Sequence, residues 1–158
     1  MSKFRDPARR NPVKPDSRLR VSVMGLFIKF ETVLMIHKMT GPEPDCWDLP
    51  GGGLQAGEPM IQALKREIRE ETGLSNVHVK NLLTIVEGFF PNWRGQLLHS
   101  LSIIYECSVE GEPIIHSTGD REVGSKGVQW LPIAELTSNS CSTRSWQALQ
   151  LVLSKTQA

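Results

Sequence analysis

The sequence is short of cysteine, of aromatic residues and of long apolar runs, and these shortages exclude several classes of protein. Only 3 cysteines occur in 158 residues, and none stands in a Cys-x-x-Cys pair, so neither a disulfide framework nor a structural zinc site is expected. No apolar run approaches the roughly 18 residues that a membrane-spanning helix needs. Residues 1–16 lack the apolar segment of a secretory signal. We therefore expect a protein of the reducing cytoplasm that has no membrane partner.

What remains is the composition of one globular domain. Hydrophobic residues make up 39% of the chain and charged residues 22%, with a mean hydropathy of -0.23. These values exclude disordered, collagen-like and coiled-coil chains. A chain of this length buries roughly two-thirds of its unfolded surface on folding, which is enough for one core.

The charge is unevenly distributed along the chain. Residues 1–20 hold 7 basic and 2 acidic side chains, a net charge of +5, whereas the rest holds 11 basic and 15 acidic ones, a net charge of -4. We expect residues 1–17 to form a basic, flexible arm and residues 18–158 to form the folded domain. Such an arm either binds RNA or another polyanion or acts as a solubilising tail. The lack of aromatic residues among its charges after Phe4 favours the tail.

The folded part reads as an α/β layered domain. Two short apolar runs, residues 19–30 and 33–39, predict a hairpin, and further strands are expected over residues 77–87, 97–109 and 128–131. A helix is predicted from Pro59, whose fixed φ suits the first helical position, to Gly73. Ile61, Leu64 and Ile68 would form its core stripe. A second helix is predicted over residues 142–153, with Trp146, Leu149 and Leu153 facing inward.

Three carboxylates on the first helix form the strongest chemical signal. Glu67, Glu70 and Glu71 stand at i, i+3 and i+4, so their side chains project from one side, and Ala63 leaves room beside them. Like charges at these spacings repel by about 0.2–0.5 kcal/mol per pair. Hard carboxylate oxygens favour Mg²⁺ or Mn²⁺.

The alternative is a solvated helix face on which neighbouring cations neutralise the acids. Lys65, Arg66 and Arg69 are placed to do so, and for the helix alone this interpretation is the better one. The glycines at positions 51, 52 and 53 shift the balance, because they bring free backbone carbonyls and amides against the helix, where a metal and a phosphate can both bind.

The residues from Gly52 to Leu74 resemble the signature of a known family. The defining positions, with hydrophobic ones counted as such, recur over 23 residues: Gly52, Glu58, Arg66-Glu67, Ile68, Glu70-Glu71 and Gly73-Leu74. This is the complete Nudix box, and residues 18–153 resemble the MutT-like Nudix hydrolases. One departure is Gln55, where many members carry a further Glu. The resemblance implies an α/β/α sandwich with a mixed β-sheet between the helices.

The resemblance also implies a reaction and a set of site residues. Nudix enzymes use Mg²⁺ or Mn²⁺ and an attacking water to cleave the pyrophosphate of a nucleoside diphosphate linked to another group. Glu70 and Glu71 would be the principal metal ligands, Glu67 a ligand or general base, and the Gly51 carbonyl a further ligand. Arg66 would orient Glu67, while Glu58 would stabilise the join between loop and helix.

Two further groups of candidates are less closely tied to the box. Many relatives supply one more acid from the loop before the tryptophan-containing strand, and here that is Glu122 or, as the weaker candidate, Asp120; a solvated loop is the alternative. In the loop expected over residues 89–99, Phe90 and Trp93 would stack on a base and Arg94 would bind a phosphate, with rim packing as the alternative. His99 is expected to be a core histidine.

The substrate stays open at this level. A nucleotide sugar such as ADP-ribose and a nucleoside triphosphate are equally compatible, because the box binds only the diphosphate and the metal. RNA 5′-end processing with the help of the basic arm is a second interpretation, and a non-catalytic nucleotide sensor is a third. The three intact glutamates argue against the sensor. The choice between a monomer and a homodimer, the state of many relatives, stays open, because nothing in the sequence marks an interface.

Overall fold

The structure is a computed structural model and is described for residues 16–110 and 120–156. Within these ranges the chain forms the following elements in order: β1 (Ser17–Lys29), β2 (Thr32–Lys38), β3 (Cys46–Asp48), β4 (Gly51–Gly53), α1 (Met60–Thr72), β5 (Val77–Trp93), β6 (Gln96–Val109), β7 (Val123–Pro132), the 3-10 helix η2 (Ile133–Glu135) and α2 (Thr143–Thr156). Most of the expected basic arm, residues 1–15, lies outside the described residues. Ser17 already belongs to β1, so the folded part begins slightly before Arg18.

A mixed sheet built around β1 organises the molecule. β1 pairs in parallel with β6 and antiparallel with β4, while β5 pairs antiparallel with β6 at one edge. The last residues of β1 form the predicted hairpin with β2, which continues to β3 and β7. Residues 22–27 of β1 are consecutively buried, as expected for a strand covered on both faces.

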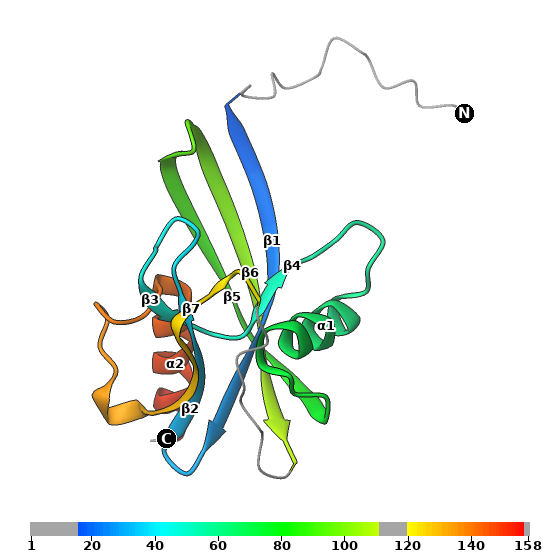
Figure 1. Cartoon of the computed structure of the whole chain (residues 1–158), viewed down its shortest axis with the longest axis vertical. Coiled ribbons are helices and arrows are strands. Elements are labelled where there is room, and N and C mark those ends of the chain that lie inside the picture. Colours follow the sequence, from blue (N-terminus) through cyan, green and yellow to red (C-terminus); the bar gives the residue numbers. More distant parts are fainter. Residues whose placement is uncertain (1–15, 111–119, 157–158) are drawn as a thin grey trace.

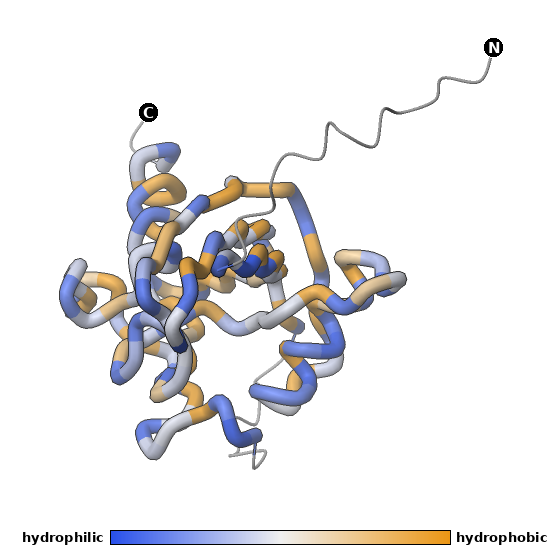
Figure 2. Tube along the Cα trace, turned by 90° about the horizontal axis from the view of Figure 1, so that it is seen from above, coloured by the Kyte–Doolittle hydropathy of each residue, from blue (hydrophilic) through white to orange (hydrophobic). Residues whose placement is uncertain are grey.

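The two helices cover opposite sides of this sheet (Figure 1). α2 packs with Met24, Leu26 and Ile104 in one core cluster, and α1 packs with Val23 and Phe27 in another. Hydrophilic residues predominate along α1, which presents only a narrow apolar stripe to the sheet (Figure 2). The α/β sandwich with a mixed sheet between helices is therefore confirmed.

Helix α1 has the predicted ends but a different core stripe. Pro59 is extended (φ -63°, ψ 140°) and lies one position before the helix, while Gly73 ends it in the left-handed conformation (φ 75°). Leu64 and Ile68 are buried as predicted, but Ile61 is 37% exposed and Ala63 is fully buried in its place. The prediction for Ile61 was wrong, because the face that α1 buries includes Ala63 and Glu71 beside Leu64 and Ile68, but not Ile61.

Helix α2 begins after Ser142, as predicted. The Ser142 hydroxyl oxygen accepts a hydrogen bond from the Ser145 N–H at 3.3 Å, the bond of an N-cap. Leu149 is buried, and Trp146 and Leu153 are half-buried against the same cluster.

The segment from Phe89 to Trp93 is strand and not the predicted loop. β5 continues to Trp93, and a tight turn at Arg94 and Gly95, both with positive φ, leads into β6. Pro91 is tolerated because β5 is an edge strand, and the register with β6 shifts between Phe90 and Trp93. His99 is not a core histidine: it is half-buried, stacks on Phe89 at 4.5 Å and contacts Glu87.

Among the residues in the described ranges, no helix is both long enough and apolar enough to cross a bilayer. All three cysteines of the chain are unpaired and buried.

Candidate active site between β4 and helix α1

The glycines of β4 bring the backbone unusually close to its neighbours. A Cβ at Gly51 would lie 2.1 Å from the Val23 carbonyl oxygen, and the φ of Gly51 is 142°, a conformation open in practice only to glycine. A Cβ at Gly52 would lie 2.5 Å from the carboxyl carbon of Glu67. The two glycines thus have different tasks, since Gly51 meets backbone and Gly52 makes room for a side chain of α1.

Arg66 holds the acids of the box in place. Its guanidinium donates two hydrogen bonds to Glu58, at 2.7 and 2.9 Å, which ties the helix to the loop that precedes it. The same guanidinium donates to Glu67 at 2.9 Å and approaches Glu70 at 3.3 Å. The carboxylates raise the pKa of Arg66 further, so its charge is permanent. Arg66 therefore neutralises part of the acid cluster and fixes the Glu67 carboxylate.

Glu71 is the buried member of the cluster. It is 3% exposed, and its carboxylate accepts a hydrogen bond from the Gly51 N–H at 2.8 Å. Burial raises its pKa well above the ordinary value, against the opposing effects of that hydrogen bond and of the Lys38 charge. Burial also raises the pKa of Glu67, although Arg66 opposes the shift. Both carboxylates are thus costly to keep ionised without a further cation.

Glu122 faces the same cluster from the loop before β7. Its charge contributes to the raised pKa values of both Glu67 and Glu71. Asp120, the weaker candidate, is used locally, because its carboxylate accepts a hydrogen bond from the Glu122 N–H at 2.8 Å. Of the two acids proposed from the sequence, the structure brings Glu122 toward the box.

The residues at this site fit a hard divalent cation by their chemistry. The donors are carboxylate oxygens, two of them with raised pKa values, and Gly52 leaves the space into which the Glu67 carboxylate projects. In the part of the chain that the structure describes, no three acidic, histidine or cysteine side chains enclose an ion position as they stand. Arg66 explains this arrangement, since it draws Glu67 and Glu70 toward itself.

Two adjoining cavities lie near β4, and Glu122 lines the outer one. The inner cavity, about 230 Å³, lies between β5, β6, the β2–β3 loop and the start of α2, and Phe90 lines it. The outer cleft, about 520 Å³, is lined by Gly53, Glu122, Trp93 and Arg94. Arg20, Thr40 and Gly41 line both, so the two form one continuous depression. The three candidates for substrate binding thus all lie along it, although Arg94 also stacks on Trp93 at 4.6 Å.

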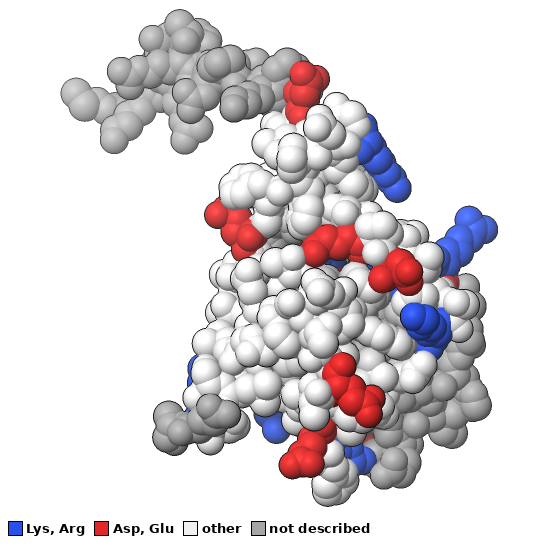
Figure 3. Space-filling model, turned by 90° about the vertical axis from the view of Figure 1, so that its left-hand side faces the viewer, with Lys and Arg blue, Asp and Glu red and all other residues white. Residues whose placement is uncertain are grey.

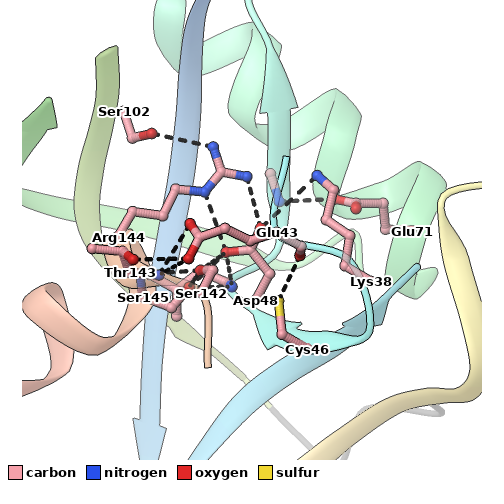
Figure 4. Close-up of polar contacts among 12 residues, drawn as sticks. Lys38, Glu43, Cys46, Asp48, Glu71, Ser102, Ser142, Thr143, Arg144 and Ser145 are labelled. Carbon is pink, nitrogen blue, oxygen red and sulfur yellow. Dashed lines mark hydrogen bonds and ion pairs between the residues drawn. The ribbon is translucent and has the colours of Figure 1, made fainter. Parts of the chain in front are cut away.

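A buried ion pair at the start of α2 closes the inner cavity and was not found from the sequence (Figure 4). Arg144 donates to Asp48 at 2.7 Å and to the Ser102 hydroxyl at 3.1 Å. The hydroxyls of Ser142 and Ser145 also donate to Asp48, and Lys38 lies 3.9 Å from it. Asp48 and Arg144 are 96 positions apart, so no local spacing could have paired them.

We predict that Asp48→Asn lowers the free energy of unfolding by about 3 kcal/mol at pH 7, because it leaves Arg144 buried without its partner. Burial would raise the pKa of Asp48, but the charge and hydrogen bonds of Arg144 outweigh it and hold this pKa well below its usual range. A carboxyl with a depressed pKa stabilises the fold above its unfolded pKa of about 3.9 and loses that effect as the pH falls. Urea unfolding at several pH values should show wild type and variant converging below about pH 4. A constant difference would contradict the assignment.

Comparison with known proteins decides the family. The family model described as the NUDIX domain matches residues 17–151. The chain belongs to the Nudix family. A MutT Nudix hydrolase from Burkholderia pseudomallei has the same fold, with a TM-score of 0.68 and 25% identity over 85% of this chain and 98% of that one. The Nudix domain of Shewanella oneidensis NrtR, solved with ADP ribose, has a TM-score of 0.68 over 99% of both chains, and its 18% identity shows the fold alone.

Curated relatives match shorter stretches of this Nudix chain. The ADP-ribose pyrophosphatase of Methanocaldococcus jannaschii is 37% identical over 91 residues, which are 58% of this chain and 52% of that protein. The RNA pyrophosphohydrolase of Xanthomonas campestris is 39% identical over 59 residues, 37% of this chain and 26% of that protein. The matches thus span about half of the first relative and about a quarter of the second.

Proposed function

We propose that this Nudix protein is a metal-dependent pyrophosphohydrolase that cleaves a nucleoside diphosphate linked to another group. The observation that carries the proposal is the meeting of α1 with β4, where the Glu67 carboxylate occupies the space that Gly52 leaves and Gly51 binds Glu71. Gly52, Glu67 and Glu71 belong to the Nudix box, and their contacts at β4 support a metal site there. The names of the relatives support the same reaction class.

In this proposal Glu67, Glu70, Glu71 and the Gly51 carbonyl hold Mg²⁺ or Mn²⁺. When bound, the metal neutralises phosphate oxygens, orients the diphosphate and acidifies water. Glu70 is half exposed and contacts Arg66 at 3.3 Å. Glu71 is anchored by the Gly51 N–H and supplies the fixed part of the ligand set.

The chain's own groups would handle the proton of the attacking water. The Glu67 carboxylate has a raised pKa and is oriented by the 2.9 Å bond from Arg66, two properties that suit a general base. Glu122 is the second candidate for this role, since its charge acts on Glu67 and it lines the outer cleft. Arg66 acts through Glu67 and is a positioning residue.

For the substrate we propose a nucleotide sugar such as ADP-ribose, with the alternative of a nucleoside triphosphate. The ADP-ribose pyrophosphatase of Methanocaldococcus jannaschii supports the first. Phe90 would stack on the base in the inner cavity. Trp93 and Arg94 would contact the rest of the substrate in the outer cleft.

We expect Phe90→Ala to raise KM by about tenfold with little change in kcat, because base stacking on an aromatic ring contributes about 1–3 kcal/mol to binding. Phe30→Ala is the matched control, since Phe30 is 87% exposed in the β1–β2 turn and lines neither cavity. Steady-state kinetics on the preferred nucleotide would measure both. Equal KM values for the two variants would contradict the assignment of Phe90 to the substrate site.

A screen of nucleoside diphosphate derivatives tests the proposed function. ADP-ribose, nucleoside triphosphates and dinucleoside polyphosphates are incubated with the full chain, with Mg²⁺, with Mn²⁺ and with EDTA. Release of a nucleoside monophosphate, or of pyrophosphate from a triphosphate, only when metal is present is the expected result. No release from any of them in either metal would favour the nucleotide sensor instead.

RNA 5′-pyrophosphohydrolysis is the second candidate, supported by the match to the RNA pyrophosphohydrolase of Xanthomonas campestris and by the basic residues near position 1. The face of the domain in Figure 3 carries scattered charges of both signs and no continuous basic patch among its described residues. This face alone thus offers no surface for RNA, and the candidate rests on the arm. RNA affinity that falls steeply with salt, and is lost when residues 1–15 are deleted, would establish this candidate.

Two lesser proposals concern the state of the protein. Three unpaired thiols support a reducing compartment such as the cytoplasm, and burial raises the pKa of Cys46 and Cys107 to about 12, which makes them unreactive.

A homodimer is supported by exposed apolar side chains on the edge strand β5, namely Leu82, Ile85 and Phe89. Light scattering would measure its mass.

A further inference from the structure

We propose that Arg20 binds the diphosphate of the substrate and thereby fixes which end of the substrate enters the inner cavity. The inference rests on the proposed function for the kind of ligand, a nucleoside diphosphate derivative. It assigns a role to a residue outside the Nudix box.

Arg20 occupies the junction of the two cavities. It lies on β1, and it lines both the inner cavity and the outer cleft. A Cβ at Gly53 would lie 3.8 Å from its Nε and 3.9 Å from one terminal nitrogen, so the guanidinium lies against β4. Glu122, whose charge acts on both Glu67 and Glu71, lines the outer cleft together with Arg20, and the charge of Glu67 also acts on Arg20. A group bound by Arg20 in the outer cleft would therefore lie near the acid cluster.

Arg20 has no acidic partner of its own in the described part of the chain. The other two cations that line the inner cavity, Lys38 and Arg144, both contact Asp48. No side-chain hydrogen bond or ion pair joins its half-buried guanidinium to a described residue, although the charges of Glu122 and Glu67 act on it from a greater distance. Burial, followed by the charge of Arg144, lowers its pKa. An anion at this place would relieve an unpaired, partly desolvated charge.

The chemistry of the guanidinium and of its surroundings selects a phosphate. Arginine binds phosphate oxygens through two parallel N–H bonds, which fixes orientation as well as charge. Ser100 pairs with Arg20 across β1 and β6, and Gly88 pairs with Ser100 across β6 and β5. These small residues form a floor beside the guanidinium, with Phe90 on the same cavity wall. A flat uncharged ring fits there, so the nucleoside end would lie in the inner cavity and the diphosphate at Arg20.

The test measures ligand binding without metal, so that hydrolysis does not contribute. Isothermal titration in EDTA at low ionic strength compares inorganic pyrophosphate and ADP-ribose on the full-length wild type, Arg20→Gln and Arg20→Lys. The matched control is Arg69→Gln, which removes the same charge from an exposed position of α1 outside both cavities. Thermal unfolding confirms that each variant is folded.

We expect Arg20→Gln to weaken both ligands by about tenfold or more, the effect of a lost charged hydrogen-bond pair. Arg20→Lys should recover part of this affinity, and Arg69→Gln should change it by less than about twofold. An unchanged affinity in Arg20→Gln would overturn the proposal, as would a wild type that binds neither ligand. Hydrolysis with Mg²⁺ is measured separately. A folded wild type that binds through Arg20 but hydrolyses nothing would refute the proposed function and leave the Arg20 assignment standing.

Discussion

Glu70→Gln should lower kcat by about a hundredfold or more while the free energy of unfolding stays within about 1 kcal/mol of wild type. The carboxylate is half exposed and accepts long hydrogen bonds from Arg66, at 3.3 and 3.4 Å, and the isosteric amide keeps its size, so we expect the substitution to leave the fold intact. Loss of one charged oxygen ligand, by contrast, would weaken metal binding, and with it the binding of the diphosphate by the metal.

The matched control for this variant is Glu135→Gln, which removes an exposed carboxylate in η2, far from the box in sequence and outside both cavities. Steady-state turnover at saturating Mg²⁺ and urea unfolding would be measured on both proteins. Near-normal turnover by a folded Glu70→Gln protein would refute the assignment of Glu70 as a metal ligand.

Gly51→Ala and Gly52→Ala should fail in different ways although they are neighbours. A methyl group at Gly52 would meet the carboxylate of Glu67, at 2.5 Å from its carbon, and a side-chain end can move aside. The variant should therefore fold, with the Glu67 carboxylate displaced by about 1 Å, and lose about a hundredfold in kcat.

A methyl group at Gly51 would meet the Val23 carbonyl oxygen at 2.1 Å, and the φ of 142° is strained for any other residue. Because backbone cannot move aside cheaply, Gly51→Ala should lower the free energy of unfolding by about 3 kcal/mol or more. Circular dichroism during thermal unfolding separates the two results. If the two variants were equally stable and equally active, the close contacts of Gly51 with β1 and of Gly52 with α1 would be contradicted.

Local spacing predicted the parts of the site that lie on one helix. Glu67, Glu70 and Glu71 are close because a helix places positions i, i+3 and i+4 on one side, and Gly73 ends that helix through its left-handed φ. The same spacing could not show which flank meets the sheet. The exposure of Ile61 and the burial of Ala63 depend on where β1 and β4 lie, and that is a property of the tertiary structure.

The other errors concern segments whose structure depends on tertiary contacts that local sequence patterns do not show. Pro91 and the polar residues after it are typical of a loop, yet an edge strand needs no partner on its outer side, so β5 continues past the proline. Strand β7 was predicted too short, because residues 124–127 have no apolar pattern and lie in the irregularity between the Val128–Ile36 and Val123–Lys38 pairs. The ion pair between Asp48 and Arg144 could not be predicted, because only the tertiary structure buries these two distant residues side by side.

The most direct measurement of the central claim is the position of Mn²⁺ in a crystal of the full chain, located by its anomalous scattering in the presence of a nucleotide product. The account predicts an ion between α1 and β4, bound by oxygens of Glu67, Glu70 and Glu71. An ion bound elsewhere, or none in a crystal whose protein hydrolyses the substrate in Mn²⁺, would contradict it.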